Sequence, residues 1–182
     1  MASGLQSHSI LHPANFVTAV RALLVAFVAT YLIAPASLES AWRMVAAASA
    51  ATVLDGVDGW LARRTGKASR FGARFDMETD AAMILVLSLI AYESGKAGAW
   101  VLASGLLRYA FVAAGLALPW MAAPLPPRWR RQAVCVAQVI ALIVAVSPIA
   151  RPPASAAIAG LSLAALAYSF CIDTLWLSRQ AA

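Results

Sequence analysis

The sequence predicts an all-α fold, an integral membrane bundle of six transmembrane helices. Two observations support this fold class. Of the 182 residues, 62% are apolar and 12% are charged, with a mean hydropathy of +0.77, whereas soluble domains are about half apolar and a quarter charged. The apolar runs are continuous and rich in Ala and Leu, without the alternation that a transmembrane β-barrel requires.

Each apolar run approaches the roughly 20 residues that a helix needs to cross a bilayer. The six helices are expected over residues 15–34, from 41 to 63 or 64, and over 76–92, 97–118, 131–148 and 154–177. These helices use nearly the whole chain, so we expect residues 1–182 to form a single domain with a short juxtamembrane segment over about 1–13. That segment contains no Lys or Arg, and we expect no cleaved signal peptide.

The basic residues predict the orientation in the membrane. They give a net charge of +6 but lie scattered between apolar runs, so no nucleic-acid partner is expected. By the positive-inside rule, the side that carries most of them is cytoplasmic, together with both termini. We therefore expect a bacterial inner (plasma) membrane protein with its polar site at the cytoplasmic side. Nine of the basic residues share that side: Arg63, Arg64, Lys67, Arg70, Arg74, Arg128, Arg130, Arg131 and Arg179.

Two further arginines, Arg21 and Arg108, interrupt apolar spans. Ionisable groups within a membrane usually face the bundle interior or a wet cavity, although a long arginine side chain can also extend to the nearer interface. Both interpretations stay open from the sequence. Cys135 and Cys171 also lie in apolar runs, and their spacing indicates neither a disulfide nor a zinc site.

Acidic residues cluster in one part of the chain, where five of the eight fall between residues 55 and 80. Asp55 and Asp58 are three residues apart and Asp76 and Asp80 are four apart, so each pair shares one face of its helix. An antiparallel hairpin would bring the pairs together, and two carboxylates ~5 Å apart repel by about 3 kcal/mol at an effective dielectric of 20. Either nearby arginines or divalent cations must compensate. Mg²⁺ and Mn²⁺ prefer carboxylate oxygens and bridge to phosphates.

The order of these residues adds a motif. The pattern D-x2-D-G-x2-A-R-x8-G-x3-D-x3-D resembles the signature of the CDP-alcohol phosphatidyltransferase (phosphotransferase) family. It is formed by Asp55, Asp58, Gly59, Ala62, Arg63, Gly72, Asp76 and Asp80. Upstream, Asn15, Thr18 and Arg21 are similar to the N-x2-T-x2-R of the family's first helix.

The resemblance implies a role for each residue. Asp55, Asp58 and Asp76 would bind a pair of Mg²⁺ or Mn²⁺ ions, and Asp80, beside the metals, would be the catalytic base that accepts the proton of the attacking hydroxyl. Nucleotide and donor binding are expected from the small residues and from the polar residues around them. These are Gly59, Ala62, Arg63, Gly72, Asn15, Thr18 and Arg21, with Lys67 as either a phosphate ligand or a headgroup anchor.

The implied enzyme moves a phosphatidyl group from CDP-diacylglycerol, or a related CDP-linked donor, to a small alcohol and releases CMP. Residues 74–81 match neither the D-P-x-A-D-K of phosphatidylglycerophosphate synthases nor the D-S-x-A-D of phosphatidylserine synthases, so the acceptor stays open. Arg108, Arg130 and Arg131 are candidate acceptor ligands, which favours a phosphorylated alcohol such as glycerol 3-phosphate. Glu78 is expected to pair with Arg74, four residues away.

An alternative reading is a small membrane cation transporter that uses the acidic cluster as its ion site. The position of the acids at helix ends, beside a basic loop, favours phosphate chemistry at the membrane surface over an ion path at the bilayer midplane. The resemblance also implies a homodimer within the lipid membrane. Small residues at positions 46, 50, 110 and 114 allow close helix approach without identifying an interface.

Overall fold

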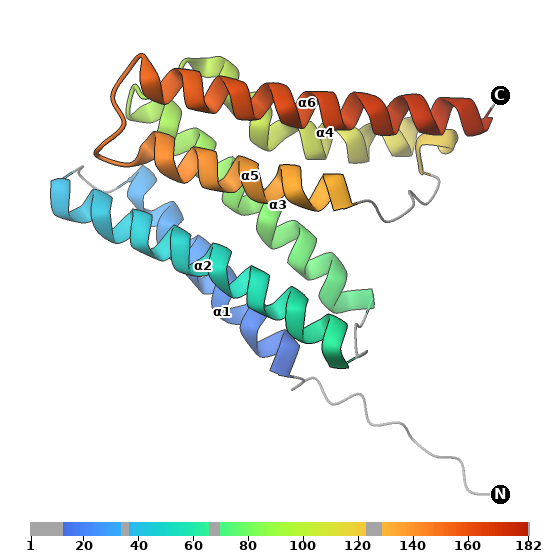
Figure 1. The fold of residues 1–182 in the computed structure, drawn as a ribbon, viewed down its shortest axis with the longest axis horizontal. Helices are drawn as coiled ribbons and strands as arrows, with labels where there is room; N and C mark the ends of the chain where they lie inside the picture. The colour runs from blue at the N-terminus through green and yellow to red at the C-terminus, as the bar shows by residue number, and fades with distance from the viewer. Residues whose placement is uncertain (1–12, 34–36, 66–69, 123–128, 182) are drawn as a thin grey trace, which may run out of the picture.

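In the computed structural model, α-helices account for most of residues 13–33, 37–65, 70–122 and 129–181, which are the residues that the structure describes. Six α-helices follow one another in this part of the chain, as the sequence predicts, together with three short 3-10 turns (Figure 1). The helices are α1 (Pro13–Ala29), α2 (Leu38–Thr65), α3 (Arg70–Glu93), α4 (Ala103–Ala117), α5 (Trp129–Val146) and α6 (Ala154–Ala181). The 3-10 turns are η1 (Thr30–Leu32), η2 (Ala99–Leu102) and η3 (Pro119–Ala122).

Helix starts and ends follow local chemistry. At the start of α2, Ser37 and Ser40 form a reciprocal cap: the Ser40 N–H donates to the Ser37 hydroxyl at 3.1 Å, and the Ser37 N–H donates to the Ser40 hydroxyl at 2.8 Å. After α3, Gly95 takes a left-handed backbone conformation, with φ of 66°, and the N–H of Lys96 donates back to the Ala91 carbonyl at 2.9 Å. The expected third helix began at residue 76, whereas α3 begins at Arg70, so the charged residues before the apolar run are also helical.

Three helical stretches of the described chain are long and apolar enough to cross a membrane: Ala99–Ala117, Trp129–Val146 and Ala154–Gln180. A shorter apolar helix covers Val17–Leu32. Helices α2 and α3 are longer than most of these, but they carry the charged residues of the motif. A bundle in which all six helices span the bilayer therefore stays a prediction.

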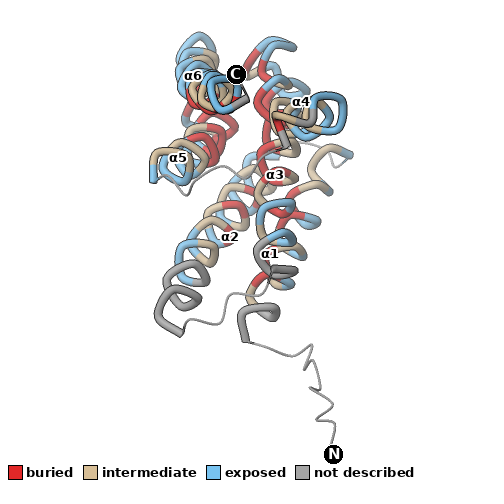
Figure 2. Tube along the Cα trace, turned by 90° about the vertical axis from the view of Figure 1, so that its right-hand side faces the viewer, coloured by how far each residue is buried: buried red, intermediate tan, exposed pale blue. Residues whose placement is uncertain are grey.

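Helix α3 is central in the packing. It contacts α1, α4 and α5, while α1 pairs with α2 and α5 pairs with α6. Buried residues face the interior between these helices, and exposed residues lie on their outer sides (Figure 2). Helices α3 and α4 approach closely at Gly105, where an added Cβ would lie 2.6 Å from the Leu85 Cα.

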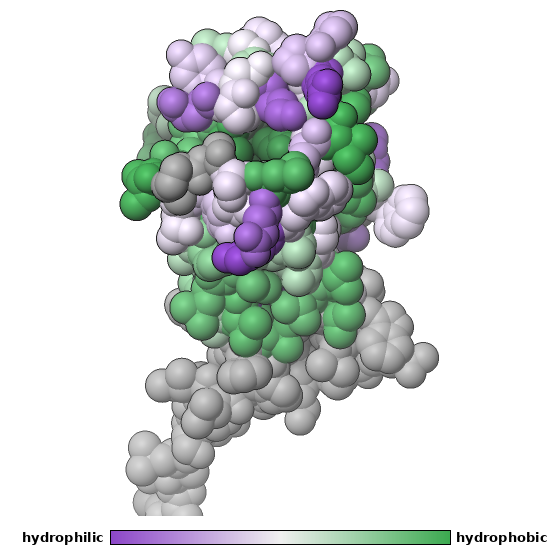
Figure 3. Space-filling view, turned by 90° about the vertical axis from the view of Figure 1, so that its left-hand side faces the viewer, coloured by the Kyte–Doolittle hydropathy of each residue, from purple (hydrophilic) through white to green (hydrophobic). Residues whose placement is uncertain are grey.

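The helix ends fall into two groups. The C-terminal ends of α2, α4 and α6 lie on the right in Figure 1, with the N-terminal ends of α3 and α5. At the opposite end, Lys96 donates to the backbone carbonyls of Ser147, at 3.1 Å, and Ala150, which ties the α3–α4 connection to the α5–α6 connection. Figure 3 faces this opposite end and shows hydrophilic side chains gathered over its upper part, with apolar side chains below them.

Candidate metal centre

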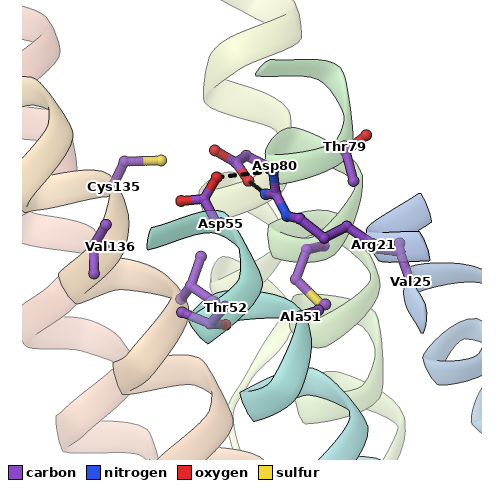
Figure 4. Close-up of a pocket in the computed structure, with 11 residues that line it drawn as sticks. Arg21, Val25, Ala51, Thr52, Asp55, Thr79, Asp80, Cys135 and Val136 are labelled. Atoms are coloured by element: carbon purple, nitrogen blue, oxygen red, sulfur yellow. Dashed lines mark hydrogen bonds and ion pairs between the residues drawn. The ribbon is translucent and has the colours of Figure 1, made fainter. Parts of the chain in front are cut away.

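A pocket lies where α1, α2, α3 and α5 meet (Figure 4). Its acidic side is formed by Asp55 of α2 and Asp80 of α3, and Arg21 of α1 extends between them. Cys135 lies opposite on α5, and further lining side chains are mostly apolar. The charged groups of this pocket therefore lie between helices whose other lining side chains are mostly apolar, so their main electrostatic partners are one another.

Three carboxylates converge here, and two of them, Asp55 and Asp80, line the pocket. One oxygen from each of Asp55, Asp76 and Asp80 lies within 4.8 Å of the other two. Asp76 and Asp80 face the same way because they are one helical turn apart on α3, and Asp55 reaches them from α2. All three side chains are only partly exposed, at 23%, 38% and 30% respectively. Oxygen ligands of this kind at this separation suit a hard divalent cation.

Arg21 compensates part of this negative charge. Its side chain is 3% exposed, and its Nη1 atom lies 2.8 Å from the Asp55 carboxylate. The same guanidinium donates to Asp76 and to Asp80. Arg21 therefore faces the bundle interior, which is one of the two positions that the sequence left open. Thr18, one turn earlier on α1, is also buried.

Arg108, the other arginine within an apolar run, pairs with Glu78, so the partner of Glu78 is not the arginine near it in the sequence. Its Nη2 atom donates to Glu78 at 2.6 Å and thereby joins α4 to α3. The sequence suggested Arg74 as the partner of Glu78, because the two are four residues apart on one helix. Glu78 lies on the side of α3 opposite to Asp76 and Asp80, where α4 can reach it.

Arg130 and Arg131, at the start of α5, meet Asp173 of α6. Arg130 donates to the Asp173 carboxylate at 2.7 Å and to the hydroxyl and carbonyl of Ser169 at 2.9 and 3.1 Å. The Arg131 Nε atom lies 3.6 Å from the other Asp173 oxygen. The Asp173 side chain is 6% exposed. Sequence reasoning missed Asp173, although a single acid within a long apolar helix is itself a signal of a buried partner.

The model of the CDP-alcohol phosphatidyltransferase family matches residues 11–172 of the chain. The chain belongs to the CDP-alcohol phosphatidyltransferase family. A search of curated proteins found no match, and a search of solved structures found none either. Membership of the CDP-alcohol phosphatidyltransferase family assigns the protein to the transferases of phospholipid synthesis and suggests phosphatidyl transfer from a CDP-alcohol donor.

Divalent-metal dependence is general in the CDP-alcohol phosphatidyltransferase family, and the chemistry of this centre fits it. The donor set consists of carboxylate oxygens alone, and the three carboxylates carry more negative charge than the single Arg21 guanidinium balances. A hard dication is the kind of ion that such a set attracts.

Several motif residues lie outside the described side chains. Positions 58, 59, 62 and 63 are helical in α2, and position 72 is helical in α3, but only their backbone is described. The same holds for Asn15 in α1, and Lys67 lies outside the described residues altogether. Three of the four predicted carboxylates are thus observed together, and Asp58 joins them only as a prediction. The described lining of the pocket does not include Arg108, Arg130 or Arg131.

Proposed function

We propose that this protein is a metal-dependent CDP-alcohol phosphatidyltransferase, which transfers a phosphatidyl group from CDP-diacylglycerol, or a related CDP-linked lipid, to a small alcohol. The single observation that carries the proposal is the convergence of Asp55, Asp76 and Asp80 from two helices, beside a pocket that Asp55 and Asp80 line. Family membership supports the reaction class. The products are a new phosphodiester and CMP, and the enzyme belongs with the phosphotransferases for substituted phosphate groups (EC 2.7.8.-).

The proposed ligands of a Mg²⁺ or Mn²⁺ pair are Asp55, Asp58 and Asp76, with Asp80 beside them. When bound, the ions supply charge neutralisation at the pyrophosphate and at the departing CMP. Asp80 accepts the proton of the alcohol as its oxygen attacks phosphorus. This role suits a carboxylate that lines the pocket and is partly exposed, because an acceptor hydroxyl must reach it.

Donor binding is assigned to residues around the carboxylates. Gly59, Ala62 and Gly72 leave room for the cytidine, because a larger side chain would hold the nucleotide away from the helix backbone. The cationic and polar donors assigned to its phosphates and sugar are Arg63, Lys67, Asn15, Thr18 and Arg21. Of these, Thr18 and Arg21 are supported by their burial on the face of α1 that meets the site.

For the acceptor, we propose a phosphorylated alcohol such as glycerol 3-phosphate or an inositol phosphate. The support is the number of arginines that the chain carries beyond those of the motif. Arg108 donates to Glu78 through Nη2, and Arg130 donates to Asp173 through Nη2 and to Ser169 through Nη1, which fixes both side chains. A guanidinium has five N–H donors, so each arginine keeps donors for a phosphate. Arg131 belongs to the same group through Asp173.

The proposed setting is a homodimer in a bacterial inner membrane, with the carboxylates at the cytoplasmic side. In this position the acyl chains of the donor remain in lipid, while the cytidine and the acceptor approach from water. Three apolar helices long enough to cross a bilayer support the membrane location. The grouping of the C-terminal ends of α2, α4 and α6 at one end of the molecule supports the orientation (Figure 1).

The test is CMP release by the purified protein from CDP-diacylglycerol with Mg²⁺ or Mn²⁺. Serine, glycerol 3-phosphate, inositol, inositol 1-phosphate and choline are offered in turn as acceptors. We expect turnover with one of them, loss of turnover in EDTA, and loss of turnover in Asp80→Asn with nucleotide binding retained. Glu93→Gln removes an exposed acid at the far end of the same helix and is the matched control.

Each outcome bears on a different part of the proposal. Full activity in rigorously chelated buffer would exclude the metal role. Unchanged turnover in Asp80→Asn would remove the base assignment while leaving the reaction in place. Failure with every CDP-linked donor, combined with cation uptake by proteoliposomes, would favour the transporter.

A further inference from the structure

One guanidinium contacts all three clustered carboxylates. Arg21 of α1 lies 2.8 Å from Asp55 of α2 and donates to Asp76 and Asp80 of α3. It therefore joins three helices at the candidate metal centre. The Arg21 side chain is 3% exposed, so this cation is almost completely enclosed by the helices.

Arg21 does not balance all the negative charge of the carboxylates, and the carboxylates do not accept from every N–H donor of Arg21. Three carboxylates face one guanidinium, so the carboxylates carry more negative charge than Arg21 balances. The Arg21 Nε atom is buried and has no hydrogen-bond partner among the described residues. A buried donor without a partner costs free energy, and so does each uncompensated carboxylate. A cation of higher charge in place of the Arg21 guanidinium would therefore balance more of the carboxylate charge.

A divalent cation and the Arg21 guanidinium cannot both occupy this position. Mg²⁺ binds carboxylate oxygens at about 2.0–2.1 Å and demands near-octahedral geometry. The guanidinium contacts the Oδ1 atom of each of these carboxylates, and two cations that share these atoms repel each other. A metal ion that takes the three Oδ1 atoms therefore requires the guanidinium to withdraw.

We infer that Arg21 is a positioning residue that stands in for the metal: it holds Asp55, Asp76 and Asp80 together before metal binds and competes with the metal for them. This inference rests on the proposed metal-dependent function. Arg21 then stabilises the metal-free protein and weakens metal affinity. Once displaced, its guanidinium is beside the site, where it can serve the phosphates of the donor.

The test is direct Mn²⁺ binding to the purified protein, followed by the electron paramagnetic resonance of free Mn²⁺, together with thermal unfolding with and without Mn²⁺. Arg21→Met removes the charge and keeps the length of the side chain. We expect Arg21→Met to melt at a lower temperature without metal, and to bind Mn²⁺ about tenfold more tightly, the equivalent of about 1.4 kcal/mol. Arg21→Lys keeps a cation without the planar fork, so we expect it to fold and to bind Mn²⁺ with intermediate affinity.

The control is Arg43→Met, which removes an arginine from an exposed ion pair with Glu39 in α2 and leaves Mn²⁺ affinity unchanged. If wild-type protein binds no Mn²⁺, the proposed function fails and this inference fails with it. If wild-type protein binds Mn²⁺ but both Arg21 variants bind it equally or more weakly, the inference alone is overturned. Arg21 would then help to bind the metal and would not compete with it.

Discussion

Asp173 provides a prediction that separates a buried charge pair from an exposed one. The Asp173→Asn variant keeps the shape of the side chain and one carbonyl oxygen but removes the negative charge. Arg130 and Arg131 would then keep their charges at the α5–α6 contact without a counter-charge. The perturbation is local, because the Ser169 hydroxyl and carbonyl still accept from Arg130.

The magnitude follows from the geometry of the contact. Asp173 makes one strong charge-assisted hydrogen bond, at 2.7 Å to Arg130, and one longer contact, at 3.6 Å to Arg131. Hydrogen bonds to charged groups contribute about 1.5–3 kcal/mol. Breaking a fully buried ion pair costs about 3–5 kcal/mol, but both arginine side chains are 29% exposed, so the smaller range applies. We expect Asp173→Asn to lower the free energy of unfolding by about 1.5–3 kcal/mol.

The assay is unfolding of the detergent-solubilised protein, with Glu39→Gln as the matched control. Glu39 forms a pair with Arg43 in which both side chains are mostly exposed, at 76% and 64%. Such a pair contributes at most about 1 kcal/mol. A second readout is the KM for a phosphorylated acceptor, which we expect to rise in Asp173→Asn while the KM for the lipid donor stays constant. If Asp173→Asn costs no more than Glu39→Gln, the reasoning about this contact is refuted.

Three further predictions concern the packing of the helices and the contact between two of their connections, and all three are measured by thermal unfolding. Gly105→Ala should destabilise the protein by about 1–3 kcal/mol, because the new Cβ would lie 2.6 Å from the Leu85 backbone. Gly160→Ala should be neutral or stabilise by up to about 1 kcal/mol, because its nearest neighbour is the Trp100 ring at 3.5 Å, and equal effects would contradict this packing. Lys96→Met should cost about 1.5–3 kcal/mol by removing the hydrogen bonds to the α5–α6 connection, and an unchanged melting temperature would contradict that role.

The helices themselves could be predicted because their signals are local. Six apolar runs of membrane-spanning length, separated by proline-containing or charged segments, predict the six described α-helices in their order. The boundaries were less predictable where polar residues are also helical. The start of α3 at Arg70 shows this, because hydropathy marks the apolar part of a helix and misses its charged first turns.

The motif was equally visible in the sequence, since fixed spacings on helices determine which side chains share a face. Asp76 and Asp80 lie together for this reason, whereas Asp55 reaches them from α2, which packs on α1 and α5 and not broadly on α3. Neither the burial of the Arg21 side chain nor its partners could be predicted from the sequence. The same arginine in an apolar run is compatible with an interior ion pair or with a side chain that extends to the interface.

Composition and spacing along the chain were enough to predict the helical class, the family motif and the three carboxylates that lie together in the structure. The packing of the helices sets the contacts of Arg21 with Asp55, Asp76 and Asp80, of Glu78 with Arg108, and of Asp173 with the arginines of α5. Each of these contacts joins different helices. The partners are set by the rotation and depth at which two helices pack, which depend on the surfaces of both helices together and not on spacing along either one.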